Sequence, residues 1–490
     1  MCSKNGYNTC STLCGCGGRC TRAEAPSMWR NSQDFEFNVV PLQEGEQLTA
    51  VNSPLDSLKL FFNEKITNLV FENFNVTRDP QNHVTYDSSL RYFMVHLCML
   101  EEPKSPISLY WKDGEVNLFG GSKIISAICA RDKWKEINSR ISRAAHCSKL
   151  LEALGENVRA HYRASNYVAV DEWVPSYKGK NPFGVYMPSK PNSWGFKIYV
   201  GADSRGIPLY FRLYEGKSSK TMYQIVLEVE EKLPEGRNSV IVVDSYFGSE
   251  KLAQELNRRG RMFIMAIKSN SSLSKHYKAM AEQDIAKGEW LECLIPAQHK
   301  EGEEVHNENL LAIFFREKKD LFLVTNYCEP SETEQKHRMV STVVHFYNQF
   351  MGGVDDFDAG NWGKTQKFQD FSRCLTYWVF RAALNIAWGY WSLSSKESIT
   401  QREFISLIIL DFLKENEIVV TNKHRLGSMG KSLKCCYCKS SSTSLKCLEC
   451  NVPLHWRCIT HYHADEEMKK IVGSGLVPKE VVGPVLKGLK

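Results

Sequence analysis

Residues 166–216 organise the rest of the chain and read NYVAVDEWVPSYKGKNPFGVYMPSKPNSWGFKIYVGADSRGIPLYFRLYEG. Three runs rich in β-branched and aromatic residues, at 167–170, 196–202 and 207–214, predict three strands. The first run ends in the carboxylate pair Asp171 and Glu172. Ligands and catalytic groups collect at the carboxyl ends of strands in open α/β sheets, so this pair is predicted to lie at a functional edge.

Helices and strands alternate in the segment that follows. A helix is predicted at 220–232, an apolar strand from 239 that ends in Asp244, a helix at 249–259 and a strand at 262–268. The later strands are apolar throughout, which is typical of central strands covered on both faces. Three strands followed by helix, strand, helix and strand is the order of RNase H-like folds. The sequence therefore predicts an α/β RNase H-like core.

Other patterns interrupt and flank this core. Short strands predicted at 290–295, 310–315 and 321–326 form a β-rich insertion, with a hairpin turn at 317–320. Apolar periodicity predicts helices after the capping residue Ser53, at 90–100, 121–130, 131–154 and 341–351, and a long helical region at 371–416. The predicted domains are a Cys-bearing tail at 1–44, a helical domain at 45–165 continued at 363–425, the core at 166–269 and 341–362, the insertion at 270–340, a cysteine-rich module at 432–463 and a tail at 464–490.

Composition narrows the class of protein. A length of 490 residues suits two or three domains, and 62 basic against 56 acidic residues give a net charge of +6. That charge is compatible with a nucleic-acid partner without requiring one. No apolar run is long enough to cross a bilayer and no signal-peptide core is present, so we expect an intracellular protein with no membrane partner. The N-terminal cysteines have the spacing C-x3-C-x-C-x3-C, which fits no standard zinc pattern.

Three aspartates stand at the ends of predicted strands or just after a Gly-Gly pair that ends a predicted helix. Asp171 and Asp244 terminate apolar runs, and Asp355 follows Gly352-Gly353. Converging aspartates hold Mg²⁺, and two such ions suit phosphodiester cleavage and strand transfer. Each acid taken alone also fits a helix cap or a turn, and Asp203 and Glu172 occupy comparable positions. The pattern by itself indicates a metal-dependent nucleic-acid enzyme.

Four pairs of metal-binding side chains lie close together near the C-terminus. Thiolate and imidazole at this spacing suit tetrahedral Zn²⁺. Four pairs predict two zinc ions in a cross-braced module, with the first and third pairs sharing one ion, and metal binding supplies the folding energy of so short a segment. Cys436 is the alternative should Cys435 not ligate. The pairs are Cys435 and Cys438, Cys447 and Cys450, His455 and Cys458, and His461 and His463.

Basic and aromatic side chains interleave after Asp171 and recur around the cysteines. They suit a DNA-binding groove, where rings stack on unpaired bases and lysines pair with phosphates. A solvated charged face, or a protein-binding zinc module, is the alternative, and Trp194 fits the core as well as it fits a DNA-facing surface. The candidate DNA-binding lysines are Lys178, Lys180, Lys190, Lys197, Lys434, Lys439 and Lys446.

Several motifs together resemble piggyBac transposases, a family of DDE/D transposases related to IS4. The resemblance runs from about residue 50 to 463. The motifs are SPLD (53–56), LFF (60–62), YW (110–111), DE (171–172), YKGK (177–180), YMPSKP (186–191), WGFK (194–197), VVDSYF (242–247), YN (347–348), MGGVD (351–355) and Asp358.

The resemblance implies an RNase H-like core interrupted by an insertion, a helical domain for dimerisation and DNA binding, and a zinc domain that binds transposon ends. By motif match, Asp171, Asp244 and Asp355 would be the catalytic, Mg²⁺-binding triad and Asp358 a fourth essential acid. The implied activity is cut-and-paste transposition at TTAA targets in the nucleus, by a homodimer acting on double-stranded DNA with terminal inverted repeats.

The sequence departs from the family pattern without losing an acid. Lys180 stands where an arginine is usual, and Ser245-Tyr246 replaces Asn-Phe. Two further functions therefore remain open besides transposition. One is a domesticated protein that binds DNA or chromatin without transposing, and the other is a nuclease of the same fold that does not rejoin strands.

Overall fold

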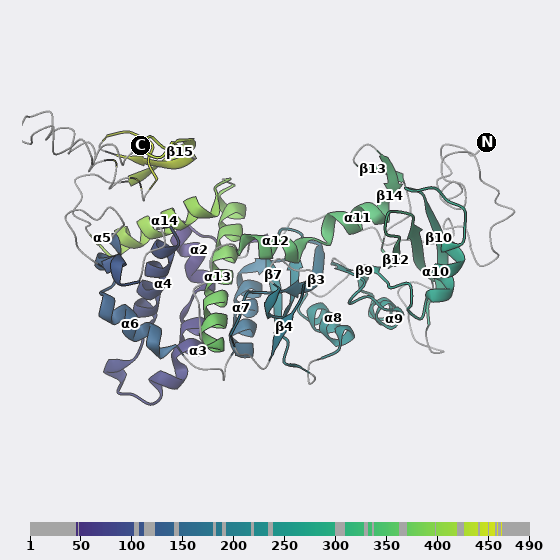
Figure 1. Cartoon of the computed structure of the whole chain (residues 1–490), viewed down its shortest axis with the longest axis horizontal. Helices are drawn as coiled ribbons and strands as arrows, with labels where there is room; N and C mark the ends of the chain where they lie inside the picture. The colour runs from purple at the N-terminus through teal and green to yellow at the C-terminus, as the bar shows by residue number, and fades with distance from the viewer. Residues whose placement is uncertain are drawn as a thin grey trace, which may run out of the picture. The chain divides into compact units, whose positions relative to one another are not determined.

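The computed structural model describes most of the chain between residues 46 and 462 and is drawn in Figure 1. The predicted tails at 1–44 and 464–490, including the N-terminal cysteines, lie outside the described residues. The described residues are 46–47, 49–101, 107–111, 123–141, 147–179, 183–188, 193–216, 220–233, 239–298, 309–327, 332–335, 338–361, 370–396, 398–418, 426–439, 442–448, 450–455, 458 and 462.

The chain divides into two compact units, a sheet unit and a helical unit. The sheet unit comprises Met1–Ala50, Leu60–Val70 and Ser142–Ser394. The helical unit comprises Val51–Lys59, Phe71–Ile141 and Ser395–Lys490. The predicted helical domain is therefore split between the two, because the helices at 147–161 and 371–394 group with the sheet.

An eight-stranded mixed sheet forms the centre of the sheet unit, in the order β10-β11-β12-β9-β8-β3-β6-β7. β3 runs parallel to β8 and β8 parallel to β9, whereas the other neighbouring strands pair antiparallel. The strands are β3 (Tyr167–Trp173), β6 (Ile198–Asp203), β7 (Pro208–Leu213), β8 (Val240–Val243), β9 (Met262–Ala266), β10 (Trp290–Pro296), β11 (Asn309–Phe315) and β12 (Leu321–Thr325).

The parallel strands β8 and β9 form the centre of the core. Every residue of VIVV (240–243) and of MFIMA (262–266) is buried, which agrees with the prediction from their continuous apolar runs. Helix α9 (Glu250–Arg258) packs on β9, and helix α8 (Met222–Glu231) packs on β7 of the same sheet. Each helix begins at a side-chain cap, Thr221 for α8 and Ser249 for α9.

The predicted β-rich insertion continues this sheet. Its three strands lie at the predicted positions, and the β11–β12 hairpin pairs Phe315 with Leu321 across the predicted turn. β12 then pairs with β9 from Leu323↔Ala266 to Thr325↔Ile264. The insertion therefore extends the core sheet at the edge of β9, and its residues share one apolar cluster with β8 and β9.

Three small two-stranded sheets complete the strands of the sheet unit. The predicted strand at 196–202 is divided, since β5 ends at Phe196 and β6 begins at Ile198. The pairs are β1 (Glu46–Gln47) with β2 (Tyr162–Arg163), β4 (Gly184–Tyr186) with β5 (Trp194–Phe196), and β13 (Glu332–Gln335) with β14 (Arg338–Ser341).

Two helices that the sequence grouped with a helical domain pack on the sheet unit instead. α7 lies on β7, where Arg159 Nη1 donates to the Leu209 carbonyl oxygen. In α13, the Tyr390 hydroxyl donates to the carbonyl oxygens of Thr49 (2.5 Å) and His161 (3.0 Å). The remaining helices of this unit are α7 (Cys147–His161), α10 (Ser274–Ala281), α11 (Thr342–Phe350), α12 (Gly353–Gly360) and α13 (Phe371–Ser395).

The helical unit is built around α4, which packs against α5, α6 and α14. Tyr92 of α4 stacks on Trp134 of α6 with ring centroids 5.4 Å apart. The predicted helical region at 371–416 is two helices, because Lys396 has a left-handed φ of 55° and Thr400 starts α14 with a capping box. The helices are α4 (Tyr86–Glu101), α5 (Lys123–Ile128), α6 (Arg131–Arg140) and α14 (Gln401–Glu415), with the 3₁₀ turns Pro80–Asn82 and Ile107–Trp111.

Two further helices, α2 (Pro54–Phe61) and α3 (Glu64–Asn75), contribute residues to both units. The predicted cap is present, since the Asp56 amide donates to Ser53 Oγ at 3.0 Å.

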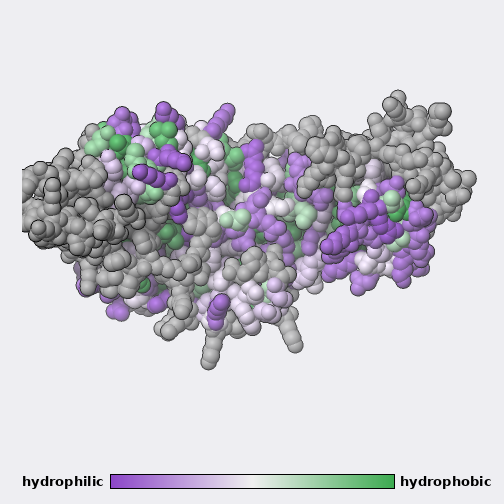
Figure 2. All heavy atoms as spheres, turned by 45° about the horizontal axis from the view of Figure 1, so that its top comes forward, coloured by the Kyte–Doolittle hydropathy of each residue, from purple (hydrophilic) through white to green (hydrophobic). Residues whose placement is uncertain are grey.

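On the face drawn in Figure 2, hydrophilic side chains occupy much of the coloured surface to the right, and smaller apolar patches lie to the left. Among the described residues, no helix has the length and apolar character needed to span a membrane.

Helix α12 approaches the sheet through a glycine. A Cβ at Gly353 would lie 2.3 Å from the Asp203 carbonyl oxygen, whereas a Cβ at the neighbouring Gly352 would meet nothing within 4 Å. Gly353→Ala should therefore displace the start of α12 and lower the free energy of unfolding by about 1–3 kcal/mol. Gly352→Ala is the matched control and should change it by less than about 0.5 kcal/mol. Equal urea midpoints for the two variants would contradict this close contact.

Candidate active site and metal centre

Asp171 lies within β3, at the point where one of its two ladders ends. The strand was expected to end at Val170, and its parallel pairing does end there, at Val170↔Val243. Its antiparallel pairing with β6 continues through Asp171↔Val200 to Trp173↔Ile198. Asp171 is therefore fixed by backbone pairing on one side only, and its side chain is half-buried.

Asp244 follows the last residue of β8 and is in register with Asp171. Because Val170 pairs with Val243, Asp171 within β3 and Asp244 just after β8 follow paired residues of neighbouring parallel strands and lie at the same level. The turn after Asp244 is tight, with the Tyr246 amide donating to Asp244 Oδ1 at 2.9 Å and the Gly248 amide donating to the Asp244 carbonyl oxygen at 2.9 Å. A Cβ at Gly248 would lie 1.9 Å from the Ala266 carbonyl oxygen, so only glycine fits there.

Burial raises the pKa values of two side chains at this site. Burial raises the pKa of Asp244, and the charge of Glu172 raises it further, while the Tyr246 amide lowers it. Burial also raises the pKa of Tyr347 in α11, and the negative charges of Asp244 and Asp171 add to that effect. Tyr347 therefore lies near both carboxylates. Sequence analysis quoted this tyrosine in a motif but gave it no role.

Asp355 and Asp358 lie on α12, which packs on β3 and β6. Asp355, in the first turn, is exposed, and Asp358 is half-buried. The third acid is therefore carried by a helix that packs on the sheet, whereas sequence analysis had placed this segment only after the Gly352-Gly353 break and predicted no helix there. Among the described residues, the ligand atoms of Asp171, Asp244 and Asp355 do not form a group lying within 4.8 Å of one another.

Asp203, one of the rival acids, has a structural role. Its side chain is fully buried and accepts hydrogen bonds from the Tyr162 hydroxyl (2.5 Å) and the amides of Ser165 (3.1 Å), Arg205 (3.0 Å) and Ile207 (3.1 Å). These bonds fix the turn between β6 and β7 and occupy both carboxylate oxygens. Asp203 therefore has no role in holding a metal ion.

The other rival acid, Glu172, forms a buried ion pair. Lys197 Nζ lies 2.7 Å from Glu172 Oε1 and donates to the Tyr246 hydroxyl at 2.9 Å. The same ammonium lies 4.3 Å from the centre of the Tyr246 ring. Burial lowers the pKa of Lys197, but the bonds to Glu172 and Tyr246 outweigh this, so the pKa is raised. The structure therefore places Lys197 inside the site, in contrast to the expectation that it contacts DNA phosphate.

Three of the other candidate DNA-binding lysines are exposed, one is half-buried and two lie outside the described residues. Lys178, Lys434 and Lys439 are exposed, and Lys446 Nζ donates to Asn451 Oδ1 at 2.8 Å. Lys180 and Lys190 lie outside the described part of the chain.

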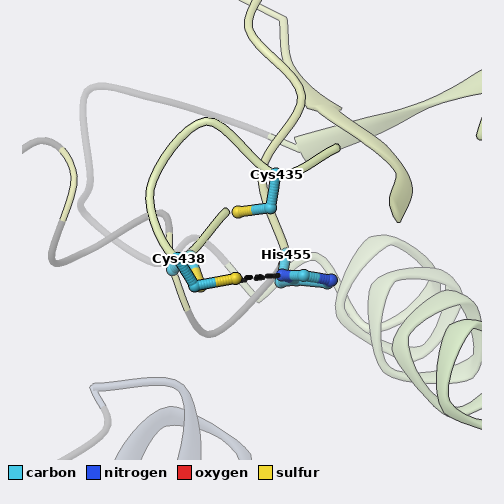
Figure 3. A group of neighbouring side chains, drawn as sticks. Cys435, Cys438 and His455 are labelled. Carbon is cyan, nitrogen blue, oxygen red and sulfur yellow. Dashed lines mark hydrogen bonds between the residues drawn. The ribbon is translucent and has the colours of Figure 1, made fainter. Parts of the chain in front are cut away.

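Four of the predicted zinc ligands converge. The ligand atoms of Cys435, Cys438, His455 and Cys458 lie within 4.8 Å of one another, and Figure 3 shows the first three. His455 Nδ1 lies 3.4 Å from Cys438 Sγ and 3.7 Å from Cys458 Sγ. Ligand atoms in a tetrahedral zinc site with one imidazole are separated by about 3.6 Å. The first and third pairs thus meet as predicted, in a donor set that fits Zn²⁺.

A hydrogen bond selects the His455 nitrogen that faces the cluster. Nε2 lies 3.1 Å from the Ser442 carbonyl oxygen, which only accepts, so Nε2 carries the proton. Nδ1 is then the nitrogen that faces the thiols, which is the one that a metal ion would use. Cys435 is buried in the cluster and Cys436 is exposed, so the alternative ligand is not needed.

The second predicted set of zinc ligands is only partly described. His461 and His463 lie outside the described residues. Cys447 and Cys450 form a turn in which the Cys450 amide donates to Cys447 Sγ at 3.4 Å. Both C-x2-C units are followed by a residue with φ of 53°, Lys439 and Asn451, so the two turns share one backbone geometry.

The cysteine-rich module is attached to α14. Its strands β15 (Leu426–Lys434) and β16 (Ser442–Cys447) pair antiparallel. Glu403 Oε1 accepts from the Ser444 amide at 3.0 Å, while Glu403 Oε2 accepts from the Thr400 amide at 2.9 Å. One carboxylate thus caps the helix and binds the module.

A family model described as Transposase IS4 matches residues 53–370, which is well over half of the chain. The chain belongs to this family of piggyBac-type transposases. The matched region contains all four candidate catalytic aspartates and ends before the cysteine-rich module.

Two human proteins are similar over much of the chain. PiggyBac transposable element-derived protein 3 is 20% identical over 475 residues, covering 85% of this chain and 77% of that protein. The Chimeric ERCC6-PGBD3 protein is also 20% identical over 475 residues, covering 85% of this chain and 43% of its own length.

A solved structure shares the fold. The cryo-EM structure of a piggyBac transposase synaptic complex with hairpin DNA matches with a TM-score of 0.60 and 17% identity. The match covers 76% of this chain and 83% of that one. The piggyBac-type fold, with its α/β core, is therefore confirmed.

The buried Glu172–Lys197 pair was not predicted for this piggyBac-type chain. Sequence analysis read Lys197 as one of several basic residues in a loop. The register would have revealed the pair, because Glu172↔Tyr199 and Trp173↔Ile198 bring the start of β6 beside Glu172. That register joins segments separated by a loop, and local patterns do not report it.

The Cys/His cluster predicts that replacing Cys438 lowers the zinc content of the protein, whereas replacing the nearby Cys436 does not. Cys438→Ser should remove one ligand and lower the zinc content of purified full-length protein by about one ion. Cys436→Ser, at an exposed neighbouring position, should retain the wild-type content. Elemental analysis of both variants measures the difference, and identical zinc content would exclude Cys438 as a ligand.

The raised pKa of Asp244 predicts a pH-dependent effect on stability. A carboxyl whose pKa is raised on folding stabilises the fold below its unfolded pKa, about 3.9, and this contribution is lost as pH rises through the folded pKa. Asp244→Asn should therefore raise the thermal unfolding midpoint at pH 7 without added Mg²⁺, and the gain should shrink towards pH 4. The exposed Asp356→Asn is the control. A gain independent of pH would contradict this explanation.

Proposed function

We propose that this chain is a piggyBac-like DNA transposase that cleaves and joins DNA with two Mg²⁺ ions. The observation that carries the proposal is the level register of Asp171 and Asp244 on neighbouring parallel strands. The sheet order supports it, since β7-β6-β3-β8-β9 is 3-2-1-4-5 in chain order with the second strand antiparallel, the arrangement of an RNase H-like core.

The donor set fits the proposed ions. Asp171, Asp244 and Asp355 offer only carboxylate oxygens, the ligands that Mg²⁺ prefers. When bound, two such ions activate the attacking oxygen and stabilise the leaving oxygen in phosphodiester chemistry. Burial that raises the pKa of Asp244 without metal also makes its carboxylate a strong partner for a cation.

The residues around the acids position them. The Tyr246 amide holds Asp244 Oδ1 in one orientation, and the Lys197 ammonium neutralises Glu172 nearby. That ion pair limits the negative charge that Asp244 experiences from Glu172 before a metal binds. Asp358 lies one turn after Asp355 on α12, where we propose that it supports the third ligand.

The proposed substrate is double-stranded DNA with terminal inverted repeats, inserted at TTAA sites by a homodimer in the nucleus. Family membership and the likeness to a synaptic complex with hairpin DNA support this assignment. The exposed Lys434 and Lys439 suit phosphate contacts by the cysteine-rich module. We propose that Zn²⁺ occupies this module, in two sites, with a structural role.

A domesticated DNA- or chromatin-binding protein is the second candidate. The human relatives carry names that call them transposable element-derived or chimeric. In this chain Ser245-Tyr246 also departs from the family motif beside Asp244, and Tyr246 is engaged with Lys197.

A nicking assay with full-length protein, duplex DNA bearing terminal inverted repeats, and Mg²⁺ tests the first proposal. Asp355→Asn should reduce nicking by at least about a thousandfold, because it removes a metal ligand. Asp356→Asn is the matched control, since it is exposed in the same helical turn, and should retain near wild-type activity.

The outcomes separate the candidate functions. Binding to DNA without nicking by any form of the protein would favour the domesticated protein. Nicking without strand-transfer products would identify a nuclease. Equal nicking by wild type and Asp355→Asn would remove Asp355 from the site.

A further inference from the structure

Two large aromatic side chains are exposed side by side on the β4–β5 ribbon. Tyr186 and Trp194 are directly opposite each other in the register, with ring centroids 4.9 Å apart. Tyr186 is 58% exposed and Trp194 is 53% exposed. Sequence analysis left open whether Trp194 lies in the core or on the surface, and the structure places it on the surface.

The base of the ribbon is anchored while its aromatic pair is not buried. Tyr177 stacks on Phe196 with centroids 5.0 Å apart, and Phe196 packs edge-on against Phe371 at 5.0 Å. Gly195 lies so close to the preceding segment that a Cβ would be 2.3 Å from the Pro175 carbonyl oxygen. Neighbouring aromatics are therefore used for packing, and the exposed rings are held on a fixed support.

The surrounding sequence has one sign of charge. Residues 174–196 contain three lysines and no aspartate or glutamate. Lys178, the one of these within the described residues, is exposed. A segment with exposed rings, positive charge and no acid suits a polyanion that also presents flat apolar faces, which describes a nucleic acid.

The ribbon lies close to the acids along the chain. It follows β3, which carries Asp171, and Trp194 precedes Val200, the antiparallel partner of Asp171, by six residues. Six residues of extended chain and one interstrand distance put the Cα atoms of Asp171 and Trp194 at most roughly 27 Å apart. This is about the length of eight base pairs of duplex DNA. A duplex of about eight base pairs is therefore long enough to contact both the acids and the aromatic pair.

We propose that Tyr186 and Trp194 form a stacking platform for unpaired nucleobases next to the cleavage site. The inference rests on the proposed function for the presence of DNA and adds the kind of DNA that the ribbon recognises. Base faces in an intact duplex are stacked on each other, so exposed rings gain a partner only where bases are unpaired. Staggered cuts in the two strands of a duplex would leave such bases.

The test compares two fluorescently labelled DNAs, a blunt duplex and the same duplex with an unpaired tail of several thymines. Binding to the full-length protein is measured by anisotropy without Mg²⁺, in the Asp244→Asn background, so that no cleavage intervenes. Protein that retains Tyr186 and Trp194 should bind the tailed DNA more tightly than the blunt duplex. Replacing both by alanine should lower that preference about tenfold or more.

Matched variants separate ring stacking from charge and from folding. Tyr186→Phe with Trp194→Phe keeps both rings and should keep the preference, and Lys178→Ala should weaken binding to both DNAs alike. The alanine pair should retain the wild-type unfolding midpoint, because both side chains are exposed. An unchanged preference in the alanine pair, or no preference before substitution, would overturn the proposal.

The results of this assay and of the nicking assay can reject the stacking platform and the transposase function separately. Loss of tail preference in the alanine pair, together with no nicking by wild-type protein, would support the platform and overturn the transposase. Nicking with an unchanged tail preference would support the transposase and overturn the platform.

Discussion

The parallel pairing of β3 with β8 is the constraint on which the proposed active site depends. Its register places Asp171 and Asp244 at one level, since Val170 pairs with Val243 immediately before them. The parallel pairing stops there, so both acids come directly after its last pair, and the β8 residues before Asp244 are all buried. Each remaining element of the site, from α12 to the Tyr246 turn, is positioned against this pair of strands.

Gathering carboxylates at one sheet edge is unfavourable without compensation, because like charges raise each other's pKa. The structure separates the acids by role. Asp203 lies opposite Val168, three residues before Asp171 in the β3–β6 ladder, and is satisfied by four hydrogen bonds at the β6–β7 turn, whereas Glu172 is paired with Lys197. Asp171 and Asp244, which lie near Tyr347, are two of the four acids that the family resemblance singled out. A buried lysine thus serves the site by neutralising an acid beside it.

Much of this organisation was predictable from sequence, because apolar runs and Cys/His spacing are local signals. The core strands lie where predicted, and Cys435, Cys438, His455 and Cys458 meet as the spacing indicated. The continuation of β3 beyond Val170, the burial of Lys197 and the joining of β12 to β9 were not predictable in this way. Each depends on pairing between segments distant in sequence, which composition and periodicity do not encode.

The extension of the core sheet has a consequence for aggregation. β12 covers the edge of β9, whose residues are all apolar and buried. Without β10 to β12, the backbone of β9 would be an uncovered edge with neither charge nor proline to block pairing with another chain. The extension therefore protects solubility as well as enlarging the sheet. A shortened relative would need another strand, a helix or a charged side chain to close that edge.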